Sequence, residues 1–535
     1  MPRARSLTRY SFVAAATLLA GTTIVSASVG KAGSGNNASA DQPNWAEDVA
    51  SVLHSNCVQC HSPGQSAPMS LRTYQEARPW AKSIGRNVES GAMPPWHASA
   101  GVGSYVNDRS LSPSDVETIL GWVRAGAPAG DLADAPEPPP LPTGEWKLGE
   151  PDFVVTFEEV EIPADGPDQF RDLVGRVALP EDKWITAVEI LPGNAKVVHH
   201  VITYRMKGFD FDPTQGWLGA WAAGTDPMIF PEGTGRLLPR GSNLIADMHY
   251  HPTGELERDS TRIGLHFADE PPAKELTNIW IMDTGFKIPA GAENHQVSAS
   301  AKFWQDGKIL GFAPHMHYRG KDFTYTAQYP DGRSEVLLRV DDYDFNWQTN
   351  YVLEEPISIP AGTVVEAVAH YDNSAANPDN PDPTIDVTFG DESYDEMMIG
   401  FVDFIVDEGV RPKTAFELRA DMIPDLAARY PGAVYKVSGR KPAERDTPEA
   451  FAPLHLPREG DGVFYVIYDN TLTAAKVYDI VWDGNEFTAK IESPRSQPFD
   501  FVGTVEGDTI DTKLLIPRRD GEVQEVGFDG ERVNS

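Results

Sequence analysis

The chain has 535 residues, more than a single hydrophobic core ordinarily organises, so several domains are expected. Its formal net charge of −34 argues against nucleic acid as a partner, because phosphate binding needs a basic surface, and equally against docking on anionic lipid. The hydrophobic content of 41% is that of a globular protein, and the only two cysteines lie in one short motif, so disulfides do not stabilise the domains.

The N-terminus has the layout of a secretory signal peptide over residues 1–27. Three arginines precede a short apolar run, residues 12–20, and small residues lead to a cleavage-like position at Ala27. The run is shorter than the ~20 residues that cross a bilayer, and an uncleaved anchor is the alternative. We therefore expect a mature protein in the periplasm or secreted, without a membrane span, that begins with a disordered segment over residues 28–43.

The motif C-V-Q-C-H at residues 57–61 is the attachment signature of c-type haem. In such a motif the thiols of Cys57 and Cys60 bond to the haem vinyl groups, and His61 is the proximal iron ligand. A redox cysteine pair and half of a zinc site are the alternatives. A redox cysteine pair is expected within a βαβ pattern, which the sequence lacks around this motif. A zinc site would need a second C-x-x-C, which the sequence also lacks.

Met93 is the expected sixth ligand of the haem iron. It precedes Pro94 and Pro95, which restrict the backbone to an irregular loop that can present a thioether to the iron. Three other side chains compete for this role: Met69, His54 and His97.

Helix signals stand on both sides of this loop. Asn44 is placed as the N-cap of a first helix, and Ser112, followed by a proline, as the N-cap of a last one. Residues 44–128 are therefore predicted to form an all-α class I cytochrome c domain. The Pro-rich residues 129–148 are expected to be a semi-rigid linker that tethers this domain to the rest.

From about residue 149 the pattern changes to short strands of alternating apolar residues separated by turn signals. Such strands predict β-sandwich or jelly-roll domains. We expect one such domain over residues 149–280 and a second over residues 281–408. Residues 409–535 are expected to form a small C-terminal β-rich module, in whose sequence we recognise no chemistry.

Six of the thirteen histidines gather in three short strand-like segments of this β region. They are the pairs His199 and His200, His249 and His251, and His315 and His317. Because neighbouring residues of a regular strand point to opposite faces, the first pair can share a metal only where the strand bulges or ends. The last pair, two residues apart on an expected strand, points to one face. Grouped neutral imidazoles suit copper, zinc or iron.

The order and spacing of these residues resemble the copper type II, ascorbate-dependent monooxygenases, the family of peptidylglycine α-hydroxylating monooxygenase and dopamine β-hydroxylase. The shared pattern is His-His, then His-Tyr, then His-x-His followed by Gly-Lys, then Asp-Glu-Met. The resemblance implies two jelly-roll-like copper domains, with ascorbate as reductant. The family's disulfide cysteines are absent here.

The same resemblance implies the ligands of two copper ions. An electron-transfer copper would be held by His199, His200 and His249, and an oxygen-binding copper by His315, His317 and Met397. His249 is preferred over His251 because the histidine before tyrosine is the ligand in the family. A soft thioether favours Cu(I), the state that reacts with O₂, and two histidines with a weak methionine leave a position open for it.

We therefore predict an exported haem–copper monooxygenase that uses O₂ to hydroxylate a C–H bond of a small substrate. The catalytic residues would be His315, His317 and Met397. Electrons would come from the fused haem, from ascorbate or from a periplasmic donor. One alternative is a periplasmic electron-transfer or copper-binding haem protein without oxygenase activity. Another is a zinc-dependent hydrolase with an appended cytochrome.

Overall fold

The computed structural model describes residues 42–535 except for residues 64, 66, 68, 142–144, 208–215, 223–224, 391, 408–409, 411, 413–422, 424–425, 429–431, 440–450, 469–470, 493–497, 518–522 and 534–535. The predicted signal peptide and nearly all of the predicted disordered segment lie outside the described residues. Strands dominate what is described, in several sheets and one small closed barrel, so the prediction of a mainly β protein is confirmed. Among the described helices, none combines the length and apolar character needed to cross a bilayer.

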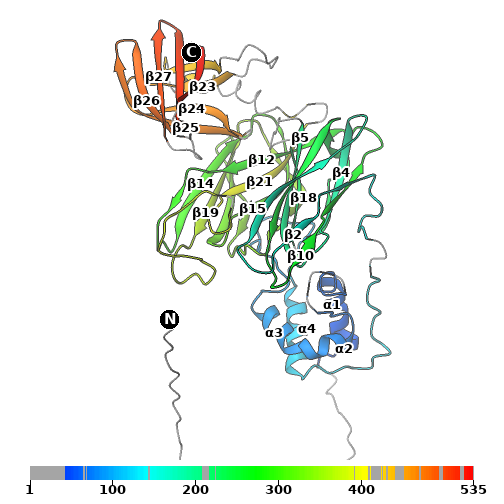
Figure 1. Cartoon of the computed structure of the whole chain (residues 1–535). Coiled ribbons are helices and arrows are strands. Elements are labelled where there is room, and N and C mark those ends of the chain that lie inside the picture. The colour runs from blue at the N-terminus through cyan, green and yellow to red at the C-terminus, as the bar shows by residue number, and fades with distance from the viewer. Residues whose placement is uncertain are drawn as a thin grey trace, which may run out of the picture. The chain divides into compact units, whose positions relative to one another are not determined.

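Helices form the first part of the described chain, drawn in blue and cyan in Figure 1. They are η1 (Trp45–Val49), α1 (Ala50–Asn56), α2 (Tyr74–Ala77), η2 (Arg78–Trp80), α3 (Ala81–Glu89) and α4 (Pro113–Arg124). Two predicted caps are confirmed. The Asn44 side chain accepts a hydrogen bond from the Glu47 amide at 3.0 Å, and Ser112 Oγ accepts one from the Asp115 amide at 3.1 Å. The helices pack around a core that contains the buried Trp122.

The stretch between α3 and α4 is not helical and joins the β region instead. Isolated bridges pair Ala98 with Val340 and Tyr105 with Leu353. Tyr105 is only 5% exposed and belongs to the apolar core of the neighbouring strands. The prediction that residues 44–128 are all-α is therefore wrong for this stretch. Tyr105 and Trp96 pack against the core of the neighbouring strands, and the prolines and glycines of the stretch do not favour a helix.

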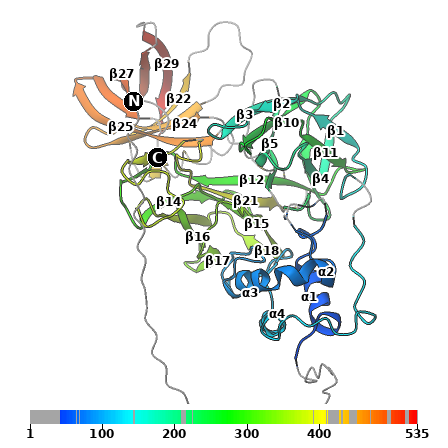
Figure 2. The same cartoon turned by 60° about the horizontal axis from the view of Figure 1, so that its bottom comes forward.

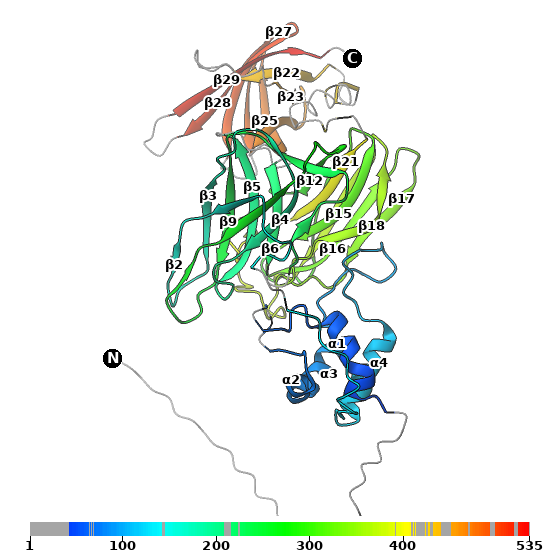
Figure 3. The same ribbon diagram turned by 90° about the vertical axis from the view of Figure 1, so that its right-hand side faces the viewer.

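Two sheets packed face to face form the first β-sandwich. One has the strand order β3-β9-β5-β6, and the other is the β1-β11-β4-β8 half of a larger sheet. The strands are β1 (Phe153–Thr156), β2 (Val160–Ile162), β3 (Gln169–Arg176), β4 (Lys183–Leu191), β5 (Val198–Lys207), β6 (Trp217–Ala222), β7 (Met228–Ile229), β8 (Thr234–Leu238), β9 (Ser242–Tyr250), β10 (Glu257–Asp259) and β11 (Arg262–Phe267). Val201 of β5 and Ile263 of β11 are buried in the core between them. Figure 3 shows β3, β9 and β5 in one layer.

The second β-sandwich packs the sheet β14-β19-β16-β17 against the strands β12-β21-β15-β18. The strands are β12 (Lys274–Met282), β13 (Lys287–Ile288), β14 (His295–Lys302), β15 (Gly307–His315), β16 (Gly320–Gln328), β17 (Ser334–Val340), β18 (Tyr351–Ile359), β19 (Val364–Tyr371), β20 (Val387–Thr388) and β21 (Ile399–Val406). β12, β21 and β15 run side by side in Figure 2. Phe323 of β16 and Val402 of β21 lie in the core between the layers.

One sheet is continuous through both sandwiches, because β8 pairs with β12 in parallel. Asp403 holds this junction: its Oδ1 accepts hydrogen bonds from the buried Arg236 at 2.8 Å and from Asn278 at 2.9 Å. The predicted boundary between residues 280 and 281 would divide β12, which pairs with β21 along its length. The two sandwiches therefore share backbone hydrogen bonds as well as side-chain contacts.

The C-terminal module contains a closed barrel of strands, coloured orange to red in Figure 1. Its strands are β22 (Val434–Gly439), β23 (Phe451–His455), β24 (Gly462–Tyr468), β25 (Thr471–Asp483), β26 (Glu486–Glu492), β27 (Phe499–Glu506), β28 (Thr509–Pro517) and β29 (Val523–Arg532). β22 pairs with β29 and so closes the barrel, whose interior holds Phe464, Phe487 and Phe501.

Candidate functional site

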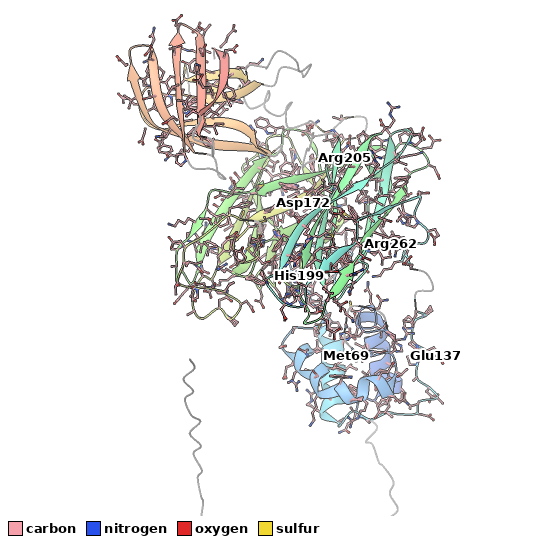
Figure 4. All side chains as sticks on the ribbon, viewed as in Figure 1. Met69, Glu137, Asp172, His199, Arg205 and Arg262 are labelled. Carbon is pink, nitrogen blue, oxygen red and sulfur yellow. The ribbon has the colours of Figure 1, made fainter. Side chains whose placement is uncertain are left out.

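Three histidines converge where β5 pairs with β9. The register of this ladder shifts between Val198 and His200, so a bulge is present where the adjacent pair requires one, and His199 is the extra residue. The Nδ1 atoms of His199 and His249 lie 3.2 and 3.3 Å from Nδ1 of His200. Possible ligand atoms of all three lie within 4.8 Å of one another. Figure 4 shows His199 and Arg205 towards opposite ends of β5.

Asp168 orients one of these three rings. His249 is fully buried, and its Nε2–H donates to Asp168 Oδ2 at 2.7 Å, so the ring presents Nδ1 to the other two. Phe170 stacks on the same ring with centroids 4.3 Å apart. The exposed His251 donates from Nδ1 to the other oxygen, Asp168 Oδ1, at 2.7 Å. The structure thus brings His249 into the group and keeps His251 outside it.

His315 and His317 form a second group at the end of β15. The strand ends at His315, so His317 lies in the following loop and not on the predicted strand. The ring centroids are 5.2 Å apart, with the planes at 88°. His315 Nδ1–H donates to Gln348 Oε1 at 2.7 Å, and His317 Nδ1–H donates to the Asp395 carbonyl at 3.4 Å. Both rings therefore present Nε2.

The segment that carries Met397 is bound to the loop that carries His317. Glu396 is fully buried and accepts hydrogen bonds from the amides of His317, at 2.8 Å, and Arg319, at 2.7 Å. Met397 is half-buried, and its carbonyl accepts a hydrogen bond from the Tyr371 hydroxyl at 2.7 Å. The loop amides therefore donate their hydrogen bonds to a carboxylate and not to the carbonyls of a neighbouring strand. This explains why β15 does not continue through His317.

One aromatic ring contacts both histidine groups. Phe345 stacks on His199 with centroids 5.2 Å apart. Its ring also makes edge contacts with His317 at 5.8 Å and with His200 at 6.4 Å. Phe345 is buried, so the two groups lie around a single apolar side chain.

Burial favours the neutral form of four of these imidazoles. It lowers the pKa of His199 to about 4, and the neighbouring His249 adds to this effect. Burial also lowers the pKa of His315 to about 4, and it puts the pKa values of His200 and His317 well below the ordinary value. Because a metal ion competes with protons for imidazole nitrogen, both groups are ready to bind one at neutral pH.

The C-V-Q-C-H motif forms a tight turn after α1. The amides of Cys60 and His61 donate to the Cys57 carbonyl at 3.2 and 2.9 Å. The thiols of Cys57 and Cys60 are free, and burial raises the pKa of Cys57 to about 12. His61 Nδ1–H donates to the Met69 carbonyl at 3.2 Å, so the ring presents Nε2.

The candidates for the sixth haem ligand differ in their surroundings. Met93 is half-buried, and its amide donates to the Asn87 carbonyl near the end of α3 at 3.1 Å. His54 uses Nε2 in a hydrogen bond to the Arg72 carbonyl at 2.8 Å, so its ring is already engaged. Met69, labelled in Figure 4, packs against the helical core.

Several side chains that shape these groups were not predicted, namely Asp168, Phe345, Gln348 and Glu396. Glu396 could have been found, because it stands in the Asp-Glu-Met motif directly before a proposed ligand. The other three lie in loops that precede β3 and β18 and follow no periodic pattern. Nothing in their local sequence separates them from other loop residues.

Comparisons with known proteins identify no family. No family model matches the chain, and no curated protein matches it. A structure of infectious bursal disease virus, Gx strain, aligns at 10% identity over 49% of this chain and 73% of that chain, with a TM-score of 0.14. The VP2 subviral particle of the same virus aligns at 8% identity over 52% of this chain and 88% of that chain, with a TM-score of 0.13. At such TM-scores the likeness carries no argument.

Proposed function

We propose that the protein is an exported haem–copper monooxygenase, acting in the periplasm or secreted, that uses O₂ to hydroxylate a C–H bond of a small substrate. The observation that carries this proposal is a pair of histidine groups with different donor sets that both contact Phe345. We assign the two sandwiches as jelly-roll-like copper domains and the helical stretch as a class I cytochrome c domain. Electrons would come from the haem, from ascorbate or from a periplasmic donor.

The donor sets fit copper. His199, His200 and His249 would hold one ion through converging Nδ1 atoms, a set suited to a centre that only exchanges electrons. The second ion would be held by His315, His317 and Met397, whose soft thioether favours Cu(I). Copper bound at this second group would supply O₂ binding and one-electron chemistry.

The neighbouring side chains would position these ligands. Asp168 and Gln348 each accept the N–H of one ring and so determine which nitrogen faces the metal. Glu396 holds the Met397 segment against the loop of the second group. Phe345 is buried and contacts rings of both groups, so it would help to fix their positions relative to each other.

The residues of the C-V-Q-C-H motif fit a covalent haem c. Cys57 and Cys60 would supply the thioether bonds, and His61 presents Nε2 as the proximal ligand. The His61 ring donates a hydrogen bond to the Met69 carbonyl. Met69 would therefore lie on the same side of the haem as His61. This arrangement supports Met93 as the sixth ligand.

Metal and haem analysis of the mature protein tests the proposal. After export and copper loading we expect about two copper ions per covalent haem, and about one after either His199→Ala or His315→Ala. Zinc in place of copper, with activity that needs no oxygen, would contradict the proposal. It would favour a hydrolase, because a carboxylate–histidine pair such as Asp168 and His249 is also common at zinc. Bound copper without O₂ consumption under any substrate screen would favour an electron-transfer protein.

Asp168→Ala is expected to weaken copper binding at the three-histidine group about 10- to 100-fold, because nothing then fixes the His249 ring with Nδ1 inward. A chelator competition titration, read by the copper EPR signal, measures the affinity. Asp322→Ala is the matched control. It removes a carboxylate from His370 in the sheet β14-β19-β16-β17 and should leave the affinity unchanged. Equal affinity in wild type and Asp168→Ala would show that Asp168 does not position the ligand.

A further inference from the structure

Asp226, in the turn after β6, gathers contacts from three distant segments. Its carboxylate accepts a hydrogen bond from the Gln59 side chain. It also pairs with Arg109 at 3.2 Å and with Lys147 at 3.5 Å. Gln59 lies between the two cysteines of the haem-attachment motif. Asp226 therefore binds the attachment loop, and both positive charges help to keep the carboxylate in place.

A cavity of about 500 Å³ lies at the same contact. Gln59 and Cys60 line it together with Trp221 of β6, Met228 of β7 and residues of β4. The attachment motif and the end of β6 thus line one cavity.

From this point a short series of bonds leads to a proposed copper ligand. Thr225, next to Asp226 in the chain, accepts a hydrogen bond from the Ala222 amide at 3.1 Å through Oγ1 and donates one to the Ala222 carbonyl at 2.9 Å. Ala222 is the cross-strand partner of His200 in the β5–β6 ladder. Electron transfer between redox centres is faster through covalent and hydrogen bonds than through empty space.

We propose that Asp226 docks the haem-attachment loop on the end of β6, and that the three-histidine group receives its electron across this end of β6, through Ala222 to His200. This inference rests on the proposed function. One electron leaves a ferrous haem c, which becomes ferric, and reduces one cupric ion to the cuprous state. No proton moves, and no bond forms or breaks.

A second connection leads from the helical stretch to the other histidine group. Trp96 and Tyr105 make edge contacts with Tyr351, with centroids 5.1 and 5.6 Å apart. Tyr351 begins the strand that follows the Gln348 loop. This aromatic cluster begins outside the C-V-Q-C-H motif and ends on no proposed ligand, so the β6 route is the more direct one. The kinetic experiment described below distinguishes the two routes.

The docking is tested first on haem-loaded, copper-free full-length protein by hydrogen–deuterium exchange. Asp226→Ala is expected to raise deuterium uptake about tenfold in rate in peptides covering the attachment motif and β6, because the carboxylate no longer holds them together. Asp341→Ala is the matched control, since it removes another surface carboxylate, which accepts a hydrogen bond from Ser99 at 2.6 Å. Uptake in these peptides that is equal in wild type and Asp226→Ala would overturn the docking.

The route is tested on haem- and copper-loaded protein under anaerobic conditions. Haem is reduced by a flash-generated flavin, and its reoxidation is followed by its visible absorbance while the cupric EPR signal of the three-histidine site falls. Asp226→Ala should slow reoxidation about tenfold at unchanged haem potential and copper content, and Asp341→Ala should not. A wild-type rate in Asp226→Ala, or slowing in Asp341→Ala alone, would overturn the β6 route. Wild-type protein that binds no copper would instead overturn the proposed function, whatever the exchange experiment shows.

Discussion

Replacing Met397 with alanine is expected to abolish O₂-dependent hydroxylation while copper stays at the three-histidine group. The thioether is the only soft donor proposed for the second copper, and without it the Cu(I) state that reacts with O₂ is no longer favoured. We expect about one of the two copper ions to be lost or weakly held, as measured by metal analysis together with product formation.

Met398 supplies a matched control for this experiment. It is the next residue, is fully buried and packs in the core of the second sandwich. Met398→Leu conserves volume and should cost less than about 1.5 kcal/mol of unfolding free energy, with both copper ions and the activity retained. Hydroxylation at the wild-type rate by Met397→Ala would contradict the assignment, as would its loss in Met398→Leu alone.

Glu396→Ala is expected to lower the free energy of unfolding by about 2–5 kcal/mol, the cost of leaving two buried amides without an acceptor. The carboxylate is fully buried, and its removal leaves the amides of His317 and Arg319 without their acceptor. It also removes the carboxyl group whose Oε1 lies 3.9 Å from the buried Arg319 guanidinium, which keeps the Asn373 side chain and the Tyr394 carbonyl as acceptors. Denaturant unfolding monitored by tryptophan fluorescence measures the change.

The same substitution should also release copper from the second group, because the segment of Met397 is no longer held against the loop of His317. Glu396→Gln keeps one oxygen as an acceptor and should retain more of both stability and copper. The idea fails if Glu396→Ala unfolds at the wild-type denaturant concentration. It also fails if that variant keeps two copper ions per haem.

Local stereochemistry made part of this structure predictable. The adjacent pair His199 and His200 can meet at one point only if the strand is interrupted, because side chains alternate between faces, and the β5–β9 ladder shifts register there. Asn44 and Ser112 are short polar side chains before apolar helical patterns, and both cap helices. In each case the reason lies within a few residues of the feature.

Features that depend on contacts between distant segments could not be predicted from the local sequence. The parallel pairing of β8 with β12 joins the sandwiches into one sheet through only two residue pairs, and no pattern in either strand specifies its partner. Phe345 and Asp168 act on histidines from other strands, so their loops alone carry no sign of the contact. The spacing of His315 and His317 suggested a strand, but a buried carboxylate from the segment of Met397 replaced the ladder.

The non-helical stretch between α3 and α4 makes the helical part of the chain continuous with the second sandwich. Tyr105 occupies the hydrophobic interior of the second sandwich, and the amide of Val106 donates to the Val352 carbonyl at 2.8 Å. A gene fragment that begins after the Pro-rich linker would therefore encode a second sandwich that lacks part of its apolar core. The helical part and the sandwiches therefore cannot be exchanged as independent domains. A variant that cannot attach the proposed haem is better made by substituting the two cysteines than by truncation.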